Sequence, residues 1–385
     1  MSRSAVSGPG PSAVEAPPSR LRQEGPRIVL VLGGGNALGA YHAGAYEQLH
    51  SRDVQPDWII GASIGAITGA ILAGNPPERR LERLRQFWRE ATLHTSGLLP
   101  HSHAKARQVY NGAHAVMATL FGRPSIFRHR FPGLWSVLPW VPNDVALYDQ
   151  SPLRDTLERL IDFDLLNRAE VRFSAGCIDI ETGDEVYFDS SRDEIRPEHI
   201  MASAAITPAF PPVEIDGRLF CDPGYTNNLP LDLPFMEPLD QDILCFAVEL
   251  FSLRSARPAS LDAILERTND LLFASHARRS VQALQREFAL RERIEPEGAA
   301  ATLIHMAYQA ASHELAAKGF DFSPSSIADR WAAGRRDMDS GLALLAGARK
   351  DARRFRYAAV ASEAALAAAE GGAAEGGAAE GGAAP

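Results

Sequence analysis

The chain has 385 residues, 45% of them hydrophobic and 23% charged, and a formal net charge of −9. This composition suits one large α/β domain or two smaller ones. The negative charge argues against a broad nucleic-acid-binding surface, so we expect no nucleic-acid partner. Cys177, Cys221 and Cys245 are widely spaced with no C-x-x-C pattern, which predicts reduced, mostly buried thiols in a cytoplasmic protein.

The two ends of the chain are expected to have no fold of their own. Residues 1–26 are rich in Pro, Ser and Gly and contain no apolar run, which predicts a disordered leader, neither a secretory signal nor a membrane anchor. Residues 359–385 end in Glu-Gly-Gly-Ala-Ala repeats, typical of a flexible tail. No stretch reaches the roughly 18 uncharged apolar residues needed to span a bilayer. We therefore expect a cytoplasmic protein whose membrane association is at most peripheral.

The first part of the expected fold alternates strand, turn and helix. "RIVLVL", residues 27–32, is a continuous apolar run typical of a buried parallel strand, and residues 40–51 follow as a helix. A second short strand at residues 56–60 leads into the small-residue helix "SIGAITGAILAG", residues 63–74. Two such units in succession predict a parallel sheet with helices on its faces.

Capping residues mark two later helices, and a turn signal marks a hairpin. Asn75 is expected to cap a helix over residues 75–92, and Ser151 to cap a helix with proline at its first position. Residues 171–190 predict a hairpin that turns at residues 182–184. The other predicted elements are a helix near 198–206, strands at 217–221 and 242–250, a mainly helical stretch over 260–292, a strand at 301–308 and a final helix over 323–345.

Residues 91–143 contain no acidic residue and have poor periodicity. The basic residues here are Lys105, Arg107, Arg123, Arg128 and Arg130, among the aromatic residues Phe121, Phe127, Phe131, Trp135 and Trp140. Basic and aromatic side chains together suit contact with lipid headgroups, so this segment is a candidate lid or interface with an anionic membrane. The alternative is a solvated loop that leaves the domain and returns.

The pentapeptide Gly61-Ala62-Ser63-Ile64-Gly65 has the G-x-S-x-G pattern of a nucleophile on a sharp turn between strand and helix. Flanking glycines avoid clashes in such a turn, and the following helix directs its N–H groups and dipole toward developing negative charge. Ser63 is therefore a candidate nucleophile. The alternative is a small residue that packs the helix against the sheet.

A glycine-rich loop, "GGGNALG", separates the first strand from the first helix. A dinucleotide loop is disfavoured because the G-x-G-x-x-G spacing is imperfect and no acidic residue ends a second strand about twenty positions on. We expect an oxyanion hole formed by the backbone N–H groups of Gly33, Gly34, Gly35 and Asn36, with Gly39 supporting the turn. The alternative is a tight turn that only allows packing.

A serine nucleophile needs a base. His276, His305 and His313 are available by chain order, but each is better interpreted as a core or surface residue. Asp222 follows a predicted strand and precedes the loop "PGYTNNLP", where active sites of open parallel sheets collect. The alternative for Asp222 is an Asx turn, which is common in Asp-Pro-Gly sequences.

In order and context, the glycine loop, the G-x-S-x-G elbow and a late Asp-x-Gly formed by Asp222 and Gly224 resemble the patatin-like phospholipase family. The resemblance covers residues 27–250, and the later part resembles the C-terminal extension of a bacterial subgroup of that family. It implies a three-layer α/β/α sandwich with a mainly parallel central sheet, followed by a mainly helical extension. It also implies lipid acyl-ester hydrolysis by a dyad of Ser63 and Asp222, with no metal or cofactor.

Two departures from the family pattern bear on activity. Asn36 stands for a glycine of the loop and Leu38 for its basic residue, although asparagine tolerates positive φ well enough for the turn to survive. Pro223 removes an N–H beside Asp222, which predicts reduced activity or an altered substrate. The competing hypotheses are an acyltransferase or thioesterase, disfavoured because Ala62 replaces the histidine expected there, and a catalytically weak binding protein.

The resulting domain prediction has a patatin-like hydrolase domain over residues 27–250, with a lid or interface insertion at residues 91–143. A mainly helical extension over residues 251–358 is expected to pack on it.

Overall fold

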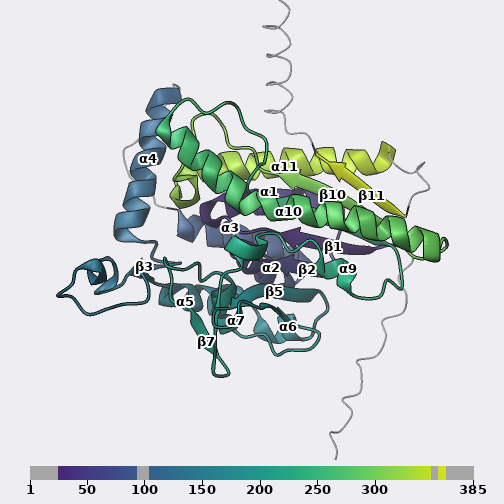
Figure 1. Ribbon diagram of the computed structural model, residues 1–385, viewed down its shortest axis with the longest axis horizontal. Coiled ribbons are helices and arrows are strands. Elements are labelled where there is room, and N and C mark those ends of the chain that lie inside the picture. Colours follow the sequence, from purple (N-terminus) through teal and green to yellow (C-terminus); the bar gives the residue numbers. More distant parts are fainter. Residues whose placement is uncertain (1–24, 93–103, 348–353, 361–385) are drawn as a thin grey trace, which may run out of the picture.

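The computed structural model describes residues 25–92, 104–347 and 354–360. Its centre is a nine-stranded sheet in the order β11-β10-β9-β1-β2-β5-β8-β7, with β6 paired to β5 (Figure 1). The sheet strands are β1 (Arg27–Leu32), β2 (Trp58–Gly61), β5 (Arg172–Asp179), β6 (Glu185–Asp189), β7 (Val213–Ile215), β8 (Arg218–Cys221), β9 (Ile243–Glu249), β10 (Ala301–Ala307) and β11 (Phe355–Ala359). From β11 to β5 all pairs are parallel, whereas β6, β7 and β8 pair antiparallel.

Helices cover both faces of this sheet. They are α1 (Ala40–Ser51), α2 (Ile64–Ala73), α3 (Pro77–Ala91), α4 (Ala104–Phe121), α5 (Ser151–Leu160), α6 (Phe163–Asn167), α7 (Pro197–Ser203), α8 (Gly224–Asn227), α9 (Leu233–Met236), α10 (Leu261–Ile294) and α11 (Pro324–Gly347). Short 3-10 helices lie at η1 (Asn36–Gly39), η2 (Gly133–Val137) and η3 (Lys318–Phe320), and β3 (Arg128–His129) pairs with β4 (Tyr148–Asp149) outside the main sheet.

The period of two along β1 divides the core into two layers. Val29 and Val31 pack in the cluster that contains the buried face of α10, whereas Leu30 and Leu32 pack in the cluster beneath α1, α2 and α11. Figure 1 shows α10 crossing one face of the sheet. The three-layer, mainly parallel α/β/α arrangement predicted from the sequence is therefore confirmed, together with the helical character of the C-terminal part.

The C-terminal part also extends the sheet. The predicted strand near residue 301 is β10, which pairs with β9, but β11 was not predicted. Its sequence "FRYAA" is short and only partly buried, so its apolar signal is weak. Because one sheet runs through both predicted domains, the boundary near residue 250 stays a proposal.

Two predicted helix caps are wrong. Asn75 does not cap α3: its side-chain amide donates to the carbonyls of Ile71 and Leu160, at 2.9 and 2.8 Å, and Pro76 is the N-cap. Ser151 is the first residue of α5, and Gln150 is the N-cap. Both side chains bond elsewhere: the amide of Asn75 bonds to the carbonyls named above, and Ser151 Oγ donates to Asp149. The hairpin at residues 182–184 is present between β5 and β6.

The basic and aromatic segment contains a helix that the sequence analysis missed. The helix α4 carries exposed Val109, Val116 and Leu120 in addition to its buried residues, so its apolar residues mark no single face. Part of the segment, residues 93–103, lies outside the described residues, as do residues 1–24 of the predicted leader and most of the predicted tail. All three cysteines are buried and free. Within the described ranges, no helix combines the length and apolar character that a membrane crossing requires.

Candidate active site

Ser63 lies in a sharp turn between β2 and α2. Its φ is 57°, a strained value for a residue with a side chain, and its N–H donates to the Ser203 carbonyl at 3.1 Å. The turn allows a close approach to β1: a Cβ on Gly65 would lie 2.1 Å from the Leu32 carbonyl oxygen. This packing gives a physical reason for the second glycine of the pentapeptide.

The other glycines of the predicted site are also packed closely. A Cβ on Gly61 would lie 2.4 Å from the Ala66 nitrogen, and one on Gly39 would lie 2.4 Å from Cγ1 of Ile64. Both distances are shorter than real Cβ contacts, so any larger residue requires the elbow or the adjoining loop to move.

Asp222 follows β8 and is 4% exposed. Its N–H donates to the Ala205 carbonyl at 3.1 Å, and its Oδ1 accepts a hydrogen bond from the Gly224 N–H at 2.7 Å. The second bond is the Asx turn that was considered as an alternative role. It occupies Oδ1 only, while Oδ2 is buried without a partner among the described residues. Gly224, the residue after Pro223, thus supplies one backbone donor to the carboxyl group.

The environment of Asp222 favours its protonated form. Burial raises the pKa of this carboxyl to about 7, while Ser63 and the Gly224 N–H lower the pKa in part. Ser63 is therefore close enough to influence the carboxylate, although no hydrogen bond of standard geometry joins the two side chains. No ion pair with Asp222 is found in the described part of the chain.

The glycine loop lies beside the serine. A Cβ on Gly34 would lie 3.0 Å from the Ser63 Cβ and 2.3 Å from Oδ1 of Asn228. The N–H groups of Gly33 and Gly34 already donate to the carbonyls of Val248 and Asn228. Of the four predicted donors, all of them within the described residues, Gly35 and Asn36 have N–H groups without a hydrogen-bond partner. Asn36 has φ 54°, the positive value anticipated for this position.

Ser63 and Asp222 line one cavity of about 260 Å³, together with Gly35 and Asn36. Its walls are mostly apolar, contributed by Ile64, Ile67, Ile126, Leu153, Ile206, Phe210, Phe251, Leu272, Phe273 and Phe320. Residues that carry a hydroxyl, a buried carboxylate and two unpaired N–H groups thus line one mostly apolar pocket. This combination can support nucleophilic acyl transfer to or from a hydrophobic acyl group.

The three histidines considered as bases do not line this cavity. His305 Nε2 lies 2.9 Å from Oε2 of Glu249, and its Nδ1 lies 3.1 Å from the Tyr357 hydroxyl. His313 lies 3.9 Å from Asp329. Across the described ranges, no group of His, Cys, Asp and Glu side chains is arranged to hold a metal ion.

The C-terminal part supplies one wall of the cavity. Residues 316–320 line the pocket, as do Asn269, Leu272 and Phe273 of α10. The buried Lys318 joins these two elements, because its Nζ donates to Glu266 at 2.9 Å and to Asp270 at 2.8 Å. The extension therefore contributes to the site, which the sequence analysis did not predict.

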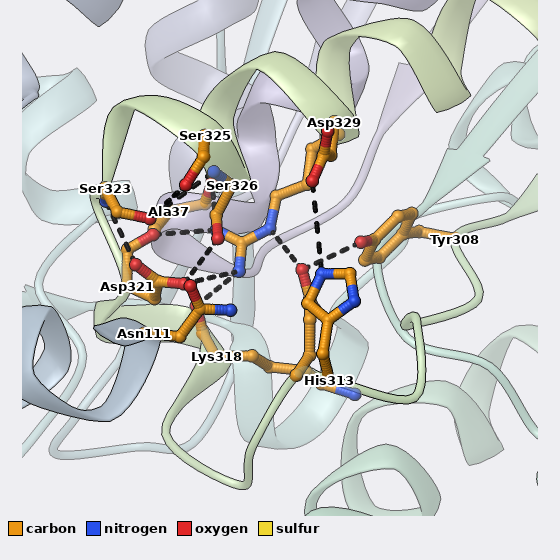
Figure 2. Close-up of polar contacts among 12 residues, drawn as sticks. Ala37, Asn111, Tyr308, His313, Lys318, Asp321, Ser323, Ser325, Ser326 and Asp329 are labelled. Atoms are coloured by element: carbon orange, nitrogen blue, oxygen red, sulfur yellow. Dashed lines mark hydrogen bonds and ion pairs between the residues drawn. The ribbon is translucent and has the colours of Figure 1, made fainter. Parts of the chain in front are cut away.

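A buried polar cluster connects this wall to the glycine loop, and Figure 2 shows its members Lys318 and Asp321 close to Ala37. The cluster is centred on Arg330. Arg330 is 0% exposed and donates to Glu314 at 3.0 Å, to the Lys318 carbonyl at 3.0 Å and to the Asp321 carbonyl at 2.9 Å. It also donates to the carbonyl of Ala37, in η1, at 3.2 Å. One side chain of α11 thus connects the loop that carries Asn36 with the loop that closes the pocket.

Sequence reasoning missed Asn228, Gln150 and Arg330. Asn228 clamps the glycine loop, since its carbonyl accepts from Gly34 N–H and its amide donates to the Gly34 carbonyl at 3.2 Å. Asn228 lies in the loop already linked to Asp222, so its position in the sequence could have suggested it. No sequence signal distinguishes Arg330 from the other arginines of α11.

A family model described as patatin-like phospholipase matches residues 30–235, which is more than half of the chain. The chain belongs to the patatin-like phospholipase family. A second model, described as patatin phospholipase, matches residues 274–351 of this patatin-like chain. The elbow, the glycine loop and Asp222 all lie within the first match.

Several curated relatives share part of this patatin-like chain. An uncharacterized NTE family protein of Mycobacterium bovis is 24% identical over 217 residues, covering 56% of this chain and 48% of that protein. A patatin-like phospholipase domain-containing protein of Caenorhabditis elegans is 26% identical over 219 residues, covering 54% of this chain and 13% of that protein. The chain thus spans about half or less of the length of these relatives. The crystal structure of VipD from Legionella pneumophila aligns over 82% of this chain and 66% of that chain, with a TM-score of 0.40 and 14% identity.

Proposed function

We propose that this patatin-like chain is a serine acyl hydrolase that cleaves lipid acyl esters through Ser63 and Asp222. The observation that carries the proposal is the shared cavity, in which a strained serine lies beside a buried carboxylate with a free oxygen. The apolar walls suit a hydrocarbon chain, and family membership supports a lipid ester as substrate.

The proposed reaction has two acyl-transfer steps. Asp222 accepts the proton of the Ser63 hydroxyl as Oγ attacks the ester carbonyl, and the N–H groups of Gly35 and Asn36 stabilise the oxyanion. Collapse of the tetrahedral intermediate expels the alcohol, which takes the proton from Asp222, and leaves an acyl group on Ser63. Water then attacks the acyl-enzyme, Asp222 takes a proton from it, and that proton returns to Ser63 as the carboxylic acid departs.

The electrostatics of the site support an aspartate as base without a histidine. A carboxyl with a pKa of about 7 is a much stronger base than an ordinary aspartate, and it is still substantially ionised near neutral pH. Burial thus supplies the basicity that a histidine provides in other serine hydrolases.

Labelling with an active-site-directed fluorophosphonate tests the nucleophile. We expect one adduct on Ser63 in the folded protein, none in Ser63→Ala, and normal labelling in Ser51→Ala, an exposed serine on α1. Activity toward p-nitrophenyl esters of increasing chain length and toward phospholipids then defines the acyl ester, and transfer to added alcohol would reveal an acyltransferase. Folded wild-type protein without label or ester turnover would favour a binding protein instead.

We also propose peripheral contact between a membrane and the segment of residues 104–140, from α4 to just beyond η2. Phe131, Trp135 and Trp140 are 85%, 61% and 77% exposed, which suits insertion at a lipid interface. Arg128 and Arg130 are ion-paired with Asp149 and Asp144, so few free cations remain for anionic lipid. Aromatic insertion should therefore contribute more than charge to this contact.

Sedimentation with vesicles tests the membrane proposal. We expect the Trp135→Ala/Trp140→Ala double variant to bind phosphatidylcholine vesicles several-fold more weakly than wild type, and vesicles with added phosphatidylserine to behave similarly. Ile294→Ala, which removes an exposed apolar residue at the end of α10, is the control and should bind like wild type. Equal binding by all three proteins would reject this surface.

A further inference from the structure

One polar atom in the wall of the catalytic cavity has no role in the proposed hydrolysis. Gln150 is the N-cap of α5, is 3% exposed and lines the same cavity as Ser63. Its Nε2 donates to the Ala204 carbonyl at 3.0 Å. Its Oε1 is buried and has no hydrogen-bond partner among the described residues. Because the bond to Ala204 fixes which end of the amide faces the backbone, the remaining atom is an acceptor.

The amide of Gln150 is anchored close to the nucleophile. The Ser203 carbonyl accepts the N–H of Ser63, and the Ala205 carbonyl accepts the N–H of Asp222. Ala204, the residue between these two, holds Gln150. Two hydrogen bonds and one peptide unit therefore separate the Gln150 amide from the Ser63 backbone, a path of roughly 10 Å at most. The Ala204 bond therefore holds the Gln150 amide beside the backbone segment that also holds Ser63 and Asp222.

The surroundings of this acceptor are apolar. Ile126, Leu153 and Phe210 are buried and line the cavity with Gln150. A buried acceptor without a partner destabilises the site, and an alkyl chain in the cavity would exclude water without replacing the missing bond. A hydroxyl on the bound chain would donate to Oε1 and restore the bond. Sites built to bond a substrate hydroxyl reject the analogue that lacks it.

We infer that Gln150 is a specificity-determining residue that selects hydroxyacyl esters, in which a hydroxyl near the ester carbonyl donates to Gln150 Oε1. This inference rests on the proposed function, because it names the acyl class that the Ser63 site cleaves. The remaining hydrocarbon of such a chain lies against the apolar walls.

Paired substrates test the selection. The kcat/KM of the wild-type protein is compared for ethyl octanoate, ethyl 3-hydroxyoctanoate and ethyl 7-hydroxyoctanoate. We expect the 3-hydroxy ester to be preferred over the other two by about tenfold or more. Turnover of all three esters with equal kcat/KM would overturn the inference while leaving the hydrolase proposal intact.

Variants separate recognition from support of the backbone. Gln150→Met keeps the length and unbranched shape of the side chain but removes both the acceptor and the bond to Ala204. Loss of the Ala204 bond should slow all three esters alike, whereas loss of the acceptor should bring the ratio of 3-hydroxy to plain ester to about 1. Gln282→Met, the same change at an exposed glutamine of α10 outside the cavity, should keep the wild-type ratio. A retained preference in Gln150→Met would overturn the role of Gln150.

Binding without turnover distinguishes failure of this inference from failure of the proposed function. Calorimetry on Ser63→Ala compares 3-hydroxyoctanoate with octanoate, and we expect the hydroxy acid to bind about tenfold more tightly. If the wild-type protein hydrolyses no ester but Ser63→Ala still binds 3-hydroxyoctanoate more tightly than octanoate, the hydrolase proposal is refuted and recognition of the hydroxyl by Gln150 stands. Equal binding of the two acids would refute the recognition, whether or not esters are cleaved.

Discussion

The cleft lined by Ser63 and Asp222 and the Arg330 cluster both bury polar groups, but the hydrogen bonding of these groups differs. In the cluster, Arg330 makes four hydrogen bonds to carbonyl and carboxylate oxygens. In the cleft, Oδ2 of Asp222 and Oε1 of Gln150 have no partner among the described residues. The four bonds of Arg330 fix one arrangement of the segments that they join, whereas the unpaired oxygens in the cleft belong to residues that line a cavity.

The two regions are mechanically connected. Arg330 contacts the carbonyl of Ala37, one residue beyond Asn36, and the carbonyl of Lys318 in the opposite wall of the pocket. Arg330 can therefore hold the glycine loop and the facing residues of the cleft in one arrangement. Variants in the cleft should mainly change activity, and variants in the cluster should mainly change stability.

The largest effect is expected from Asp222→Asn. An amide cannot accept the serine proton as a carboxylate does, so kcat should fall by about 10²–10⁴-fold with the fold retained. Ester hydrolysis with folding checked by circular dichroism measures this, and Asp216→Asn, an exposed aspartate beyond β7, is the control. Near wild-type activity in Asp222→Asn would refute the proposed dyad.

The next effect is on stability. Arg330→Met should leave Glu314 buried without its cation and lower the free energy of unfolding by about 3–5 kcal/mol. Urea unfolding of the purified protein measures the change, with Arg89→Met, an exposed arginine of α3, as the control. A loss below about 1 kcal/mol would mean that the cluster does not hold the two loops together.

As pH rises, folding stability and hydrolytic activity should change in opposite directions. Burial raises the folded pKa of Asp222 from its ordinary value of 3.8 to about 7, so the folded state binds a proton more tightly than the unfolded state. The stability of wild type relative to Asp222→Asn should therefore fall as pH rises from about 4 to 7, by roughly 2–4 kcal/mol in total. Hydrolytic activity should rise through pH 7 as Asp222 loses its proton.

Parallel unfolding curves and pH–rate profiles of wild type and Asp222→Asn measure both trends. If the stability difference between the two proteins stays constant across this pH range, burial does not raise the pKa of Asp222.

The smallest effect concerns the elbow. Ser63→Gly relieves the positive φ and should raise the free energy of unfolding by about 0.5–1 kcal/mol, whereas Ser63→Ala keeps the strain and should not. Both variants should lack activity, so comparing their unfolding isolates the cost of the turn. A gain in Ser63→Ala equal to that in Ser63→Gly would attribute the strain to the hydroxyl rather than to the backbone.

The sequence predicted the parallel strands and the elbow because these depend on short-range signals. Apolar runs identified β1, β2 and β9, and glycine spacing marked Ser63. The cap predicted at Asn75 was wrong because the side-chain amide of Asn75 donates to the carbonyl of Leu160, 85 residues away in the chain. Local propensity cannot anticipate a partner at that separation.

For the site, the sequence by itself determined the candidate pair Ser63 and Asp222, since each follows a strand end within a recognisable motif. Only the tertiary structure decided which N–H groups of the glycine loop are free, because Val248 and Asn228 take those of Gly33 and Gly34. It also placed Gln150 and Lys318 in the wall of the cavity, and it placed Arg330 in contact with the glycine loop. Their roles arise from contacts between segments up to about 290 residues apart, as for Arg330 and Ala37, and no local pattern records such contacts.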